Sequence, residues 1–182
     1  MALDDAGIAE AAEARRETPI PDDSLLPLLQ AEFALRQRDF DQGLALLSEQ
    51  AVILEDPALA RRALRLAEFV NDTDRAAMMA VRLVELDSDD GAAAAAASGW
   101  LSRAGRPVDA VYYAKLAFEH GQPVNVATNL GTYDALDEGS QLAIAEAIRA
   151  IAAQWPEDDQ AAIAASLLAR LEGDFKRAES FI

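Results

Sequence analysis

Few side chains in this sequence could carry out catalytic chemistry. His120 is the single histidine and cysteine is absent, so histidine pairs, catalytic triads, thiolate nucleophiles and thiolate zinc sites all lack residues that they need. The acidic clusters at 87–90 and 156–159 lack the spaced ligands and late bidentate glutamate of an EF-hand loop. We interpret these clusters as loops at helix starts and His120 as a helix-end or solvent residue.

Phosphate-binding motifs are missing as well. Neither GxGxxG nor GxxxxGKS/T, the two common glycine-rich nucleotide cradles, occurs in the chain. We therefore expect no enzymatic activity, no cofactor and no bound metal.

The charge balance narrows the choice of partner. With 16 basic and 32 acidic residues the net charge is −16, which repels phosphate backbones and anionic lipid surfaces. No apolar run reaches the roughly 20 residues that span a bilayer. The start, MALDDAGIAE, lacks the basic and apolar regions of a secretion signal, which leaves open whether one was removed. We expect protein partners, without nucleic-acid binding or direct membrane insertion.

An internal repeat predicts the helices on which the side chains of this sequence are arranged. Four stretches, RDFDQG, NDTDRA, GRPVDA and GDFKRA, carry a turn signal and end on a small residue. These markers, Gly43, Ala76, Ala110 and Ala178, lie 33, 34 and twice 34 residues apart. The double interval predicts a degenerate unit with its marker at Ile144. A period of 34 is that of two antiparallel helices joined by a tight turn, and a small marker lets the two helices approach closely.

The repeat predicts an all-α fold, an α-α superhelix of about five helix pairs with the last pair incomplete and no β-structure. Apolar residues recur at helical spacing, as at Leu59, Ala63 and Leu66. The repeat domain is predicted at 23–182, after an acidic lead-in at 1–22 in which 4–17 has the composition of a short helix. The predicted pairs are 24–37 with 40–54, 57–70 with 73–86, 90–104 with 107–120, 123–136 with 140–154, and 158–171 with a helix that begins at 174.

These features resemble tetratricopeptide repeats over residues 24–182. The resemblance rests on the turns, on small residues inside the helices, and on Pro57 and Pro156 at repeat junctions. It departs at Trp100, outside the usual aromatic position, and at Gln30, where a small residue is usual. Because such repeats hold other proteins, the resemblance implies a non-catalytic protein-binding scaffold or adaptor.

A narrower resemblance lies in LLQAEFALRQRDFDQGLALL, DPALARRALRLAEFVNDTDRAAMMAVRLVELDSDD and AGRPVDAVYYAKLA. These stretches are similar to the N-terminal third of longer proteobacterial tetratricopeptide lipoproteins. One such family is similar to adaptors that bind periplasmic carboxyl-terminal processing proteases and present peptidoglycan hydrolases to them. The resemblance implies such a protease as partner and a periplasmic, outer-membrane-anchored location; without it we expect a cytoplasmic protein. Two alternatives stay open, a docking solenoid of an enzyme whose catalytic domain is missing here and an outer-membrane assembly factor.

The broader resemblance also implies which side chains face a partner. In tetratricopeptide repeats, positions 5, 9 and 12 of each first helix line the inner groove, with the marker residue as position 20. Arg61 and Arg65, on one helical face, either clamp a carboxylate of a partner or pair with neighbouring acidic side chains. The expected groove residues are Leu28, Glu32 and Leu35, then Arg61, Arg65 and Glu68, then Ala95, Gly99 and Ser102, and finally Asn129, Tyr133 and Leu136.

The C-terminal end carries apolar residues with no further repeat to cover them. Ala178, Phe181 and Ile182 belong to a short last helix, whereas a solenoid needs a polar cap over its terminal apolar face. We interpret the chain as the N-terminal fragment of a longer repeat protein. We expect self-association through this end, or fraying of 174–182.

Overall fold

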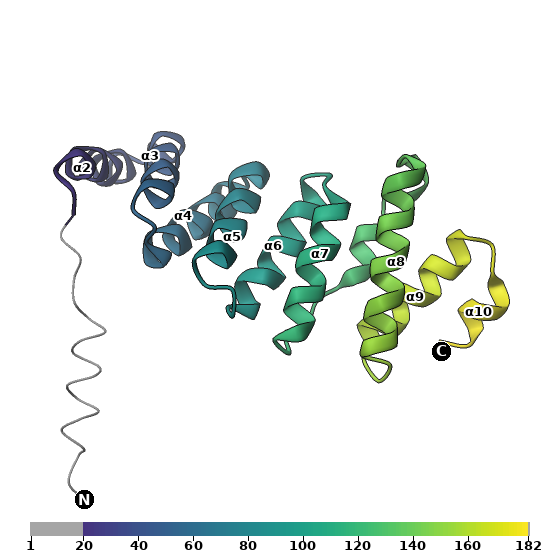
Figure 1. Ribbon diagram of the computed structural model, residues 1–182. Helices are drawn as coiled ribbons and strands as arrows, with labels where there is room; N and C mark the ends of the chain where they lie inside the picture. The colour runs from purple at the N-terminus through teal and green to yellow at the C-terminus, as the bar shows by residue number, and fades with distance from the viewer. Residues whose placement is uncertain (1–19, 182) are drawn as a thin grey trace, which may run out of the picture.

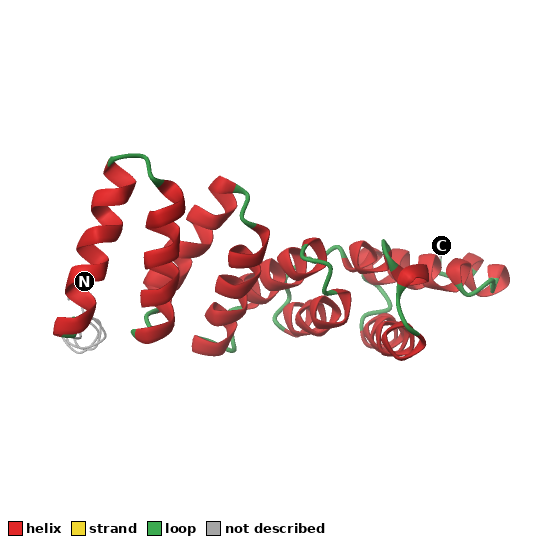
Figure 2. Ribbon diagram, turned by 90° about the horizontal axis from the view of Figure 1, so that it is seen from above, coloured by secondary structure: helices red, strands yellow, loops and turns green. Residues whose placement is uncertain are grey.

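The computed structural model describes residues 20–181, and every regular element in that range is helical (Figure 1). The helices follow one another along an elongated array, and each packs mainly against its neighbours in sequence (Figure 1, Figure 2). The predicted all-α superhelical fold is therefore confirmed for these residues, while the short helix expected at 4–17 lies outside them. The elements are α2 (Asp22–Arg36), α3 (Phe40–Ile53), α4 (Pro57–Val70), α5 (Thr73–Leu86), α6 (Gly91–Arg103), α7 (Pro107–Glu119), η1 (Val126–Leu130), η2 (Tyr133–Ala135), α8 (Glu138–Gln154), α9 (Asp159–Leu171) and α10 (Phe175–Glu179).

The turns inside four helix pairs share one backbone conformation. The first residue of each turn signal has a positive φ, in the left-handed region that glycine and asparagine adopt most easily. The N–H that follows it donates to a carbonyl five residues earlier, as from Asp39 to Ala34 at 2.9 Å. The sequence motif is thus a helix C-cap that reverses the chain. The residues with positive φ are Arg38 at 63°, Asn71 at 58°, Gly105 at 73° and Gly173 at 79°.

Aspartates begin most of the helices. In seven of the nine described α-helices, an aspartate at the N-cap accepts a hydrogen bond from a backbone N–H of the first turn. Such a cap stabilises a helix by about 0.5–2 kcal/mol relative to alanine, and its charge complements the helix dipole. As expected, the acidic clusters supply the caps Asp90 and Asp158, and His120 is the exposed C-cap of α7.

The repeat markers lie where helices meet. Ala76, Ala110 and Ile144 have no exposed surface, and Ala178 is 4% exposed. At Gly43, an added Cβ would lie 2.6 Å from Cδ2 of Leu35, which is closer than atoms in contact can approach. The small markers therefore set the separation of the paired helices, as the repeat predicts.

The helix predicted at 123–136 is wrong, because two short 3₁₀ helices, η1 and η2, occupy this segment. Pro123 and Gly131 both disfavour a continuous α-helix here, as do several β-branched residues. η1 packs against α7 and α9, so it fills the position of the fourth first helix while burying Val126 completely. The β-branched residues are Val124, Val126, Thr128 and Thr132.

The last pair is short but anchored. α10 spans five residues, and the Ser166 hydroxyl of α9 donates to the Ala178 carbonyl at 3.1 Å. Phe175, at the start of α10, leaves 65% of its surface exposed. The expected self-association or fraying at this end therefore stays a prediction, and Ile182 lies outside the described residues.

Candidate protein-binding site

The first helices of successive pairs form one face of the array, which we call the first-helix face. It consists of α2, α4, α6 and α9, with η1 in the fourth place. A polar side-chain contact joins each of the first three members to the next, and the fourth, η1, packs against α9. Some of the groove residues predicted from the sequence therefore already form contacts between neighbouring repeats. The joining contacts are Glu32 with Arg62, Arg61 with Asp90, Glu68 with Trp100, and Ser102 with the Thr128 carbonyl.

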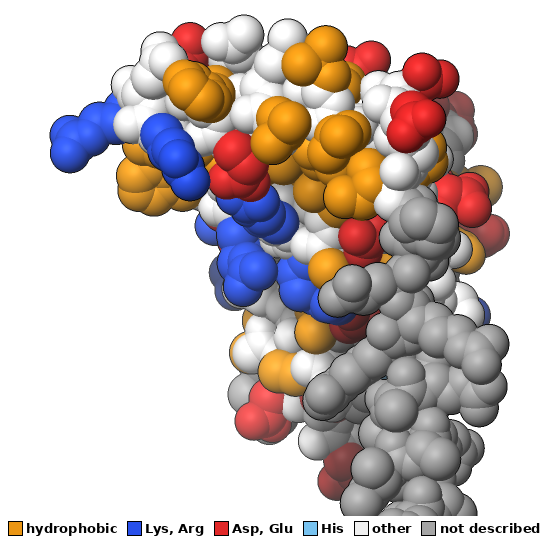
Figure 3. Space-filling model, turned by 90° about the vertical axis from the view of Figure 1, so that its left-hand side faces the viewer, with side chains coloured by type: hydrophobic (Ala, Val, Ile, Leu, Met, Phe, Trp, Pro, Cys, Tyr) orange, Lys and Arg blue, Asp and Glu red, His pale blue; other side chains and the backbone are white. Residues whose placement is uncertain are grey.

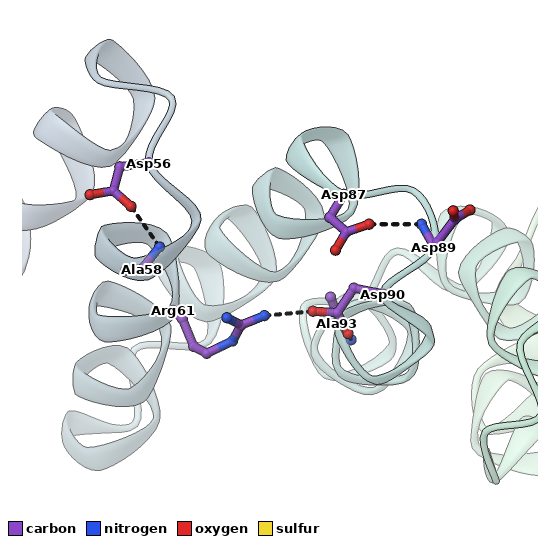
Figure 4. A network of polar contacts seen from close by, with 7 residues as sticks. All are labelled: Asp56, Ala58, Arg61, Asp87, Asp89, Asp90 and Ala93. Carbon is purple, nitrogen blue, oxygen red and sulfur yellow. Dashed lines mark hydrogen bonds and ion pairs between the residues drawn. The ribbon is translucent and has the colours of Figure 1, made fainter. Parts of the chain in front are cut away.

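Arg61 on α4 pairs with a neighbouring acid (Figure 4). Its Nη2 lies 2.6 Å from Oδ2 of Asp90, whose Oδ1 accepts the Ala93 N–H at 2.9 Å. The carboxylate thus caps α6 and holds the arginine at the same time. Because the Arg61 side chain is still 48% exposed, it keeps donors that can reach a bound molecule.

Arg62 and Arg65 extend the cationic surface of α4. Arg62 donates to Glu32 on α2, and this hydrogen bond lowers the pKa of the Glu32 carboxyl and raises the pKa of Arg62. Both side chains are nearly half exposed, so the pair adds little to stability. Arg65 is exposed, and no carboxylate among the described residues forms an ion pair with it. Arg61 therefore pairs with a neighbouring acidic side chain, which was one of the two alternatives. Arg65 can still bind a carboxylate of a partner, which was the other.

Trp100 connects α4 with α6. Its indole N–H donates to Oε1 of Glu68 at 3.1 Å, and the Arg103 guanidinium lies 4.6 Å from the centre of its ring. A tryptophan held in this way is a rigid, half-buried element of the face. The Glu68 carboxylate therefore already has a hydrogen-bond donor within the protein.

The groove positions of the third pair open onto a cleft between α6 and the segment that leads into η1. Ala95, Gly99 and Ser102, the three predicted positions, all line it, and its volume is about 280 Å³. A Cβ added at Gly99 would meet no atom within 4 Å, so the cleft is open directly above this glycine. The remaining lining residues are Ser98, Arg103, Pro123, Val124, Asn125 and Thr128.

The fourth pair does not present its predicted groove residues. Asn129 is 1% exposed and Tyr133 is 8% exposed, because η1 and η2 turn these side chains into the core instead of continuing a first helix. Burial raises the pKa of the Tyr133 hydroxyl. Both polar atoms of the Asn129 amide lack a hydrogen-bond partner. The predicted exposure of these residues is therefore wrong, and Leu136 is partly buried as well.

The two ends of the first-helix face are more apolar than its middle. On α2, the predicted residues Leu28 and Leu35 are partly buried against the core. On α9, the same register places Ile163 and Leu167, which are 46% and 38% exposed, and the exposed Arg170. From α4 to α9 the face thus changes from arginines, through a cleft floored by small residues, to two apolar side chains followed by an arginine.

A second surface, formed by α3, α5 and α7, was not predicted. Two clefts of about 360 and 420 Å³ share Val52 and Met78 in their walls, and Tyr112 is 65% exposed beside them. The available signal was the apolar doublets, because adjacent residues on a helix point about 100° apart and cannot both face the core. The doublets on these helices are Val52-Ile53, Met78-Met79 and Tyr112-Tyr113.

No protein-family model matches the chain, and no curated protein matches it either. None of the helices within 20–181 combines the length and apolar character needed to cross a membrane. The structure itself defines a class, an all-α array of stacked helix pairs with an open cleft and exposed arginines on one face.

Proposed function

We propose that this protein is a non-catalytic scaffold of the tetratricopeptide kind that holds an acidic, extended segment of a partner protein on its first-helix face. The observation that carries the proposal is the exposed set Arg61, Arg62 and Arg65 beside the open cleft at Gly99. The charges of Arg61 and Arg62 are balanced by Asp90 and Glu32. On a chain of net charge −16, Arg65 therefore supplies the local positive charge that favours a carboxylate of a partner. Arginine suits this role because its planar fork binds a carboxylate through two hydrogen bonds.

The spacing of the helices suggests how a segment would lie. Packed helices are about 8–10 Å apart, and an extended chain rises roughly 3.3 Å per residue. A segment that crosses from α4 to the cleft beside α6 therefore advances by at least about three residues. We expect a carboxylate over Arg65 and, about three residues away, a side chain that fills the cleft above Gly99. The apolar residues Ile163 and Leu167 would contact the segment further along.

The resemblance to lipoprotein adaptors supports a particular partner. We propose a periplasmic carboxyl-terminal processing protease as that partner, with cell-wall hydrolases presented to it and the full-length protein anchored at the outer membrane. What supports this narrower proposal is the similarity of the three stretches that contain α2–α3, α4–α5 and α7. A direct binding assay between the chain and a purified processing protease tests it, with the variants described next as controls.

The test of the broader proposal fills the cleft and reverses one charge. Gly99→Leu should weaken binding at least tenfold, because its side chain extends into the cleft from a Cβ that meets no atom within 4 Å. Arg65→Glu should weaken binding similarly by repelling the carboxylate. Fluorescence polarisation with two labelled peptides measures both effects. One peptide is acidic and carries a bulky residue three places from a carboxylate. The other is a copy in which lysine replaces the acidic residues.

The matched control is Arg106→Glu, which makes the same charge change on the surface formed by α3, α5 and α7. It should leave peptide binding unchanged. Gly99→Leu should also keep or raise the melting temperature, since glycine inside a helix costs about 0.5–1 kcal/mol relative to alanine. Equal affinity of the original chain and Arg65→Glu for the acidic peptides would contradict the proposed site.

A further inference from the structure

The outer side of α2 carries the densest group of exposed apolar side chains at the N-terminal end of the described array. Leu25, Leu26, Leu29 and Phe33 are 48%, 62%, 55% and 65% exposed. Seen from this end, hydrophobic side chains gather over the upper part of the molecule and Lys and Arg side chains lie below them (Figure 3). Contiguous apolar surface of this kind marks an interaction site more often than chance exposure.

The order of residues along this side of α2 is regular. Leu25, Leu29 and Phe33 follow one another at intervals of four, so they share one stripe of the helix. Asp22 lies three residues before the stripe and Arg36 three residues after it, and both fall on the same side at 100° per residue. The stripe therefore begins with an acid, ends with a base and is apolar between them.

This order is self-complementary. Leu29 is the midpoint of α2, which spans Asp22–Arg36. When two copies of the helix pack antiparallel about a twofold axis at Leu29, Leu25 of one faces Phe33 of the other, and each Asp22 faces an Arg36. Parallel packing would instead bring like charges together. Antiparallel packing also opposes the two helix dipoles, which favours the same arrangement.

We propose that this face binds a second copy of the chain, giving a twofold dimer held by antiparallel α2 helices. The contact is isologous, since the same stripe serves both copies. A single pair of 15-residue helices buries less surface than the roughly 1,200–2,000 Å² of a stable interface. The dimer is accordingly reversible and its population depends on concentration. It leaves the cleft at Gly99, on α6, free in both copies.

The test uses the fact that residue 29 meets its own counterpart at the axis. In sedimentation or light-scattering measurements at about physiological salt, where the net charge is screened, the mass should rise with concentration from 19.5 kDa towards twice that value. Leu29→Glu and Leu29→Lys should each weaken association at least tenfold, because like charges meet at the axis. An equimolar mixture of the two should associate again, because opposite charges then meet.

Two control variants locate the contact. Ile53→Glu, at a side chain of α3 that is 58% exposed, should leave association unchanged. Phe175→Glu, at the opposite end of the array, should do the same. The proposal is overturned if the original chain stays monomeric over the concentration range, if the Leu29 variants still associate, if their mixture stays monomeric, or if Phe175→Glu abolishes association. Circular dichroism of each variant shows that the fold is kept, as expected for an exposed position.

Discussion

Ala110→Leu is expected to lower the free energy of unfolding by about 1–3 kcal/mol, the usual cost of inserting extra methylene groups into a packed core. Ala110 has no exposed surface and lies early in α7, where this helix meets α6. The first pair shows how little room such a marker position has, because a Cβ at Gly43 would come within 2.6 Å of Leu35. Ala76→Leu, at the equivalent position of α5, should behave alike.

Ala92→Leu is the control for this prediction. Ala92 belongs to α6 but is exposed, so leucine there adds no atoms to the core. For a domain of this size, each kcal/mol should shift the melting temperature by about 2–4 °C. Thermal melts followed by circular dichroism compare the three variants. Equal melting temperatures would show that the register of the helix pairs is wrong.

Asn129→Leu is expected to raise the stability by about 1–3 kcal/mol. Asn129 is 1% exposed, and neither its Oδ1 nor its Nδ2 has a hydrogen-bond partner. A buried polar group that loses its hydrogen bonds to water without replacement costs about this much. Leucine has a similar shape and no polar atom, so it removes the cost without opening a cavity.

Asn125→Leu is the matched control for Asn129→Leu. Asn125 lies four residues earlier and is exposed, so its amide remains solvated and the substitution should change stability by less than about 0.5 kcal/mol. Denaturant titration gives both free energies. If Asn129→Leu is instead destabilising, the amide has a partner such as an ordered water molecule, and the buried polar group is part of a functional or structural network.

The fold was predictable where the sequence repeats its local signals. Residues that favour a positive φ, such as Asn71 and Gly105, mark the turns, and an aspartate such as Asp72 marks the next helix start. These signals act within a few residues of the chain, so sequence alone is enough to recognise them. The first three helix pairs and α9 follow from them with ends that differ by at most two residues.

The fourth pair was not predictable in the same way, because its first helix was placed by extrapolating the period rather than by its own signals. The marker Ile144 is buried as expected. The segment before it, however, contains Pro123 and Gly131 and is rich in β-branched residues, and these local preferences outweighed the period. Positions transferred onto that missing helix, Asn129 and Tyr133, were misplaced with it.

The candidate site was predicted in outline but not in its pairing. Counting from the markers correctly brought Ala95, Gly99 and Ser102 to one cleft. Counting could not show that Arg61 reaches Asp90, 29 residues later, because that contact depends on how two pairs stack. The apolar stripe of α2 was also missed, since exposure of a leucine is decided by which neighbour is present and not by its own sequence.

The two short 3₁₀ helices in the fourth pair have a consequence for the mechanics of the array. Stacked repeats transmit cooperativity only through contacts between neighbours, and 3₁₀ turns are held by poorer hydrogen bonds than α-helices. The segment 120–137 therefore joins the three regular pairs that precede it to α8–α10 through poorer hydrogen bonds than those of an α-helix. We expect bending of the array to concentrate at this joint, where it would change the separation between the arginines on α4 and the apolar residues on α9.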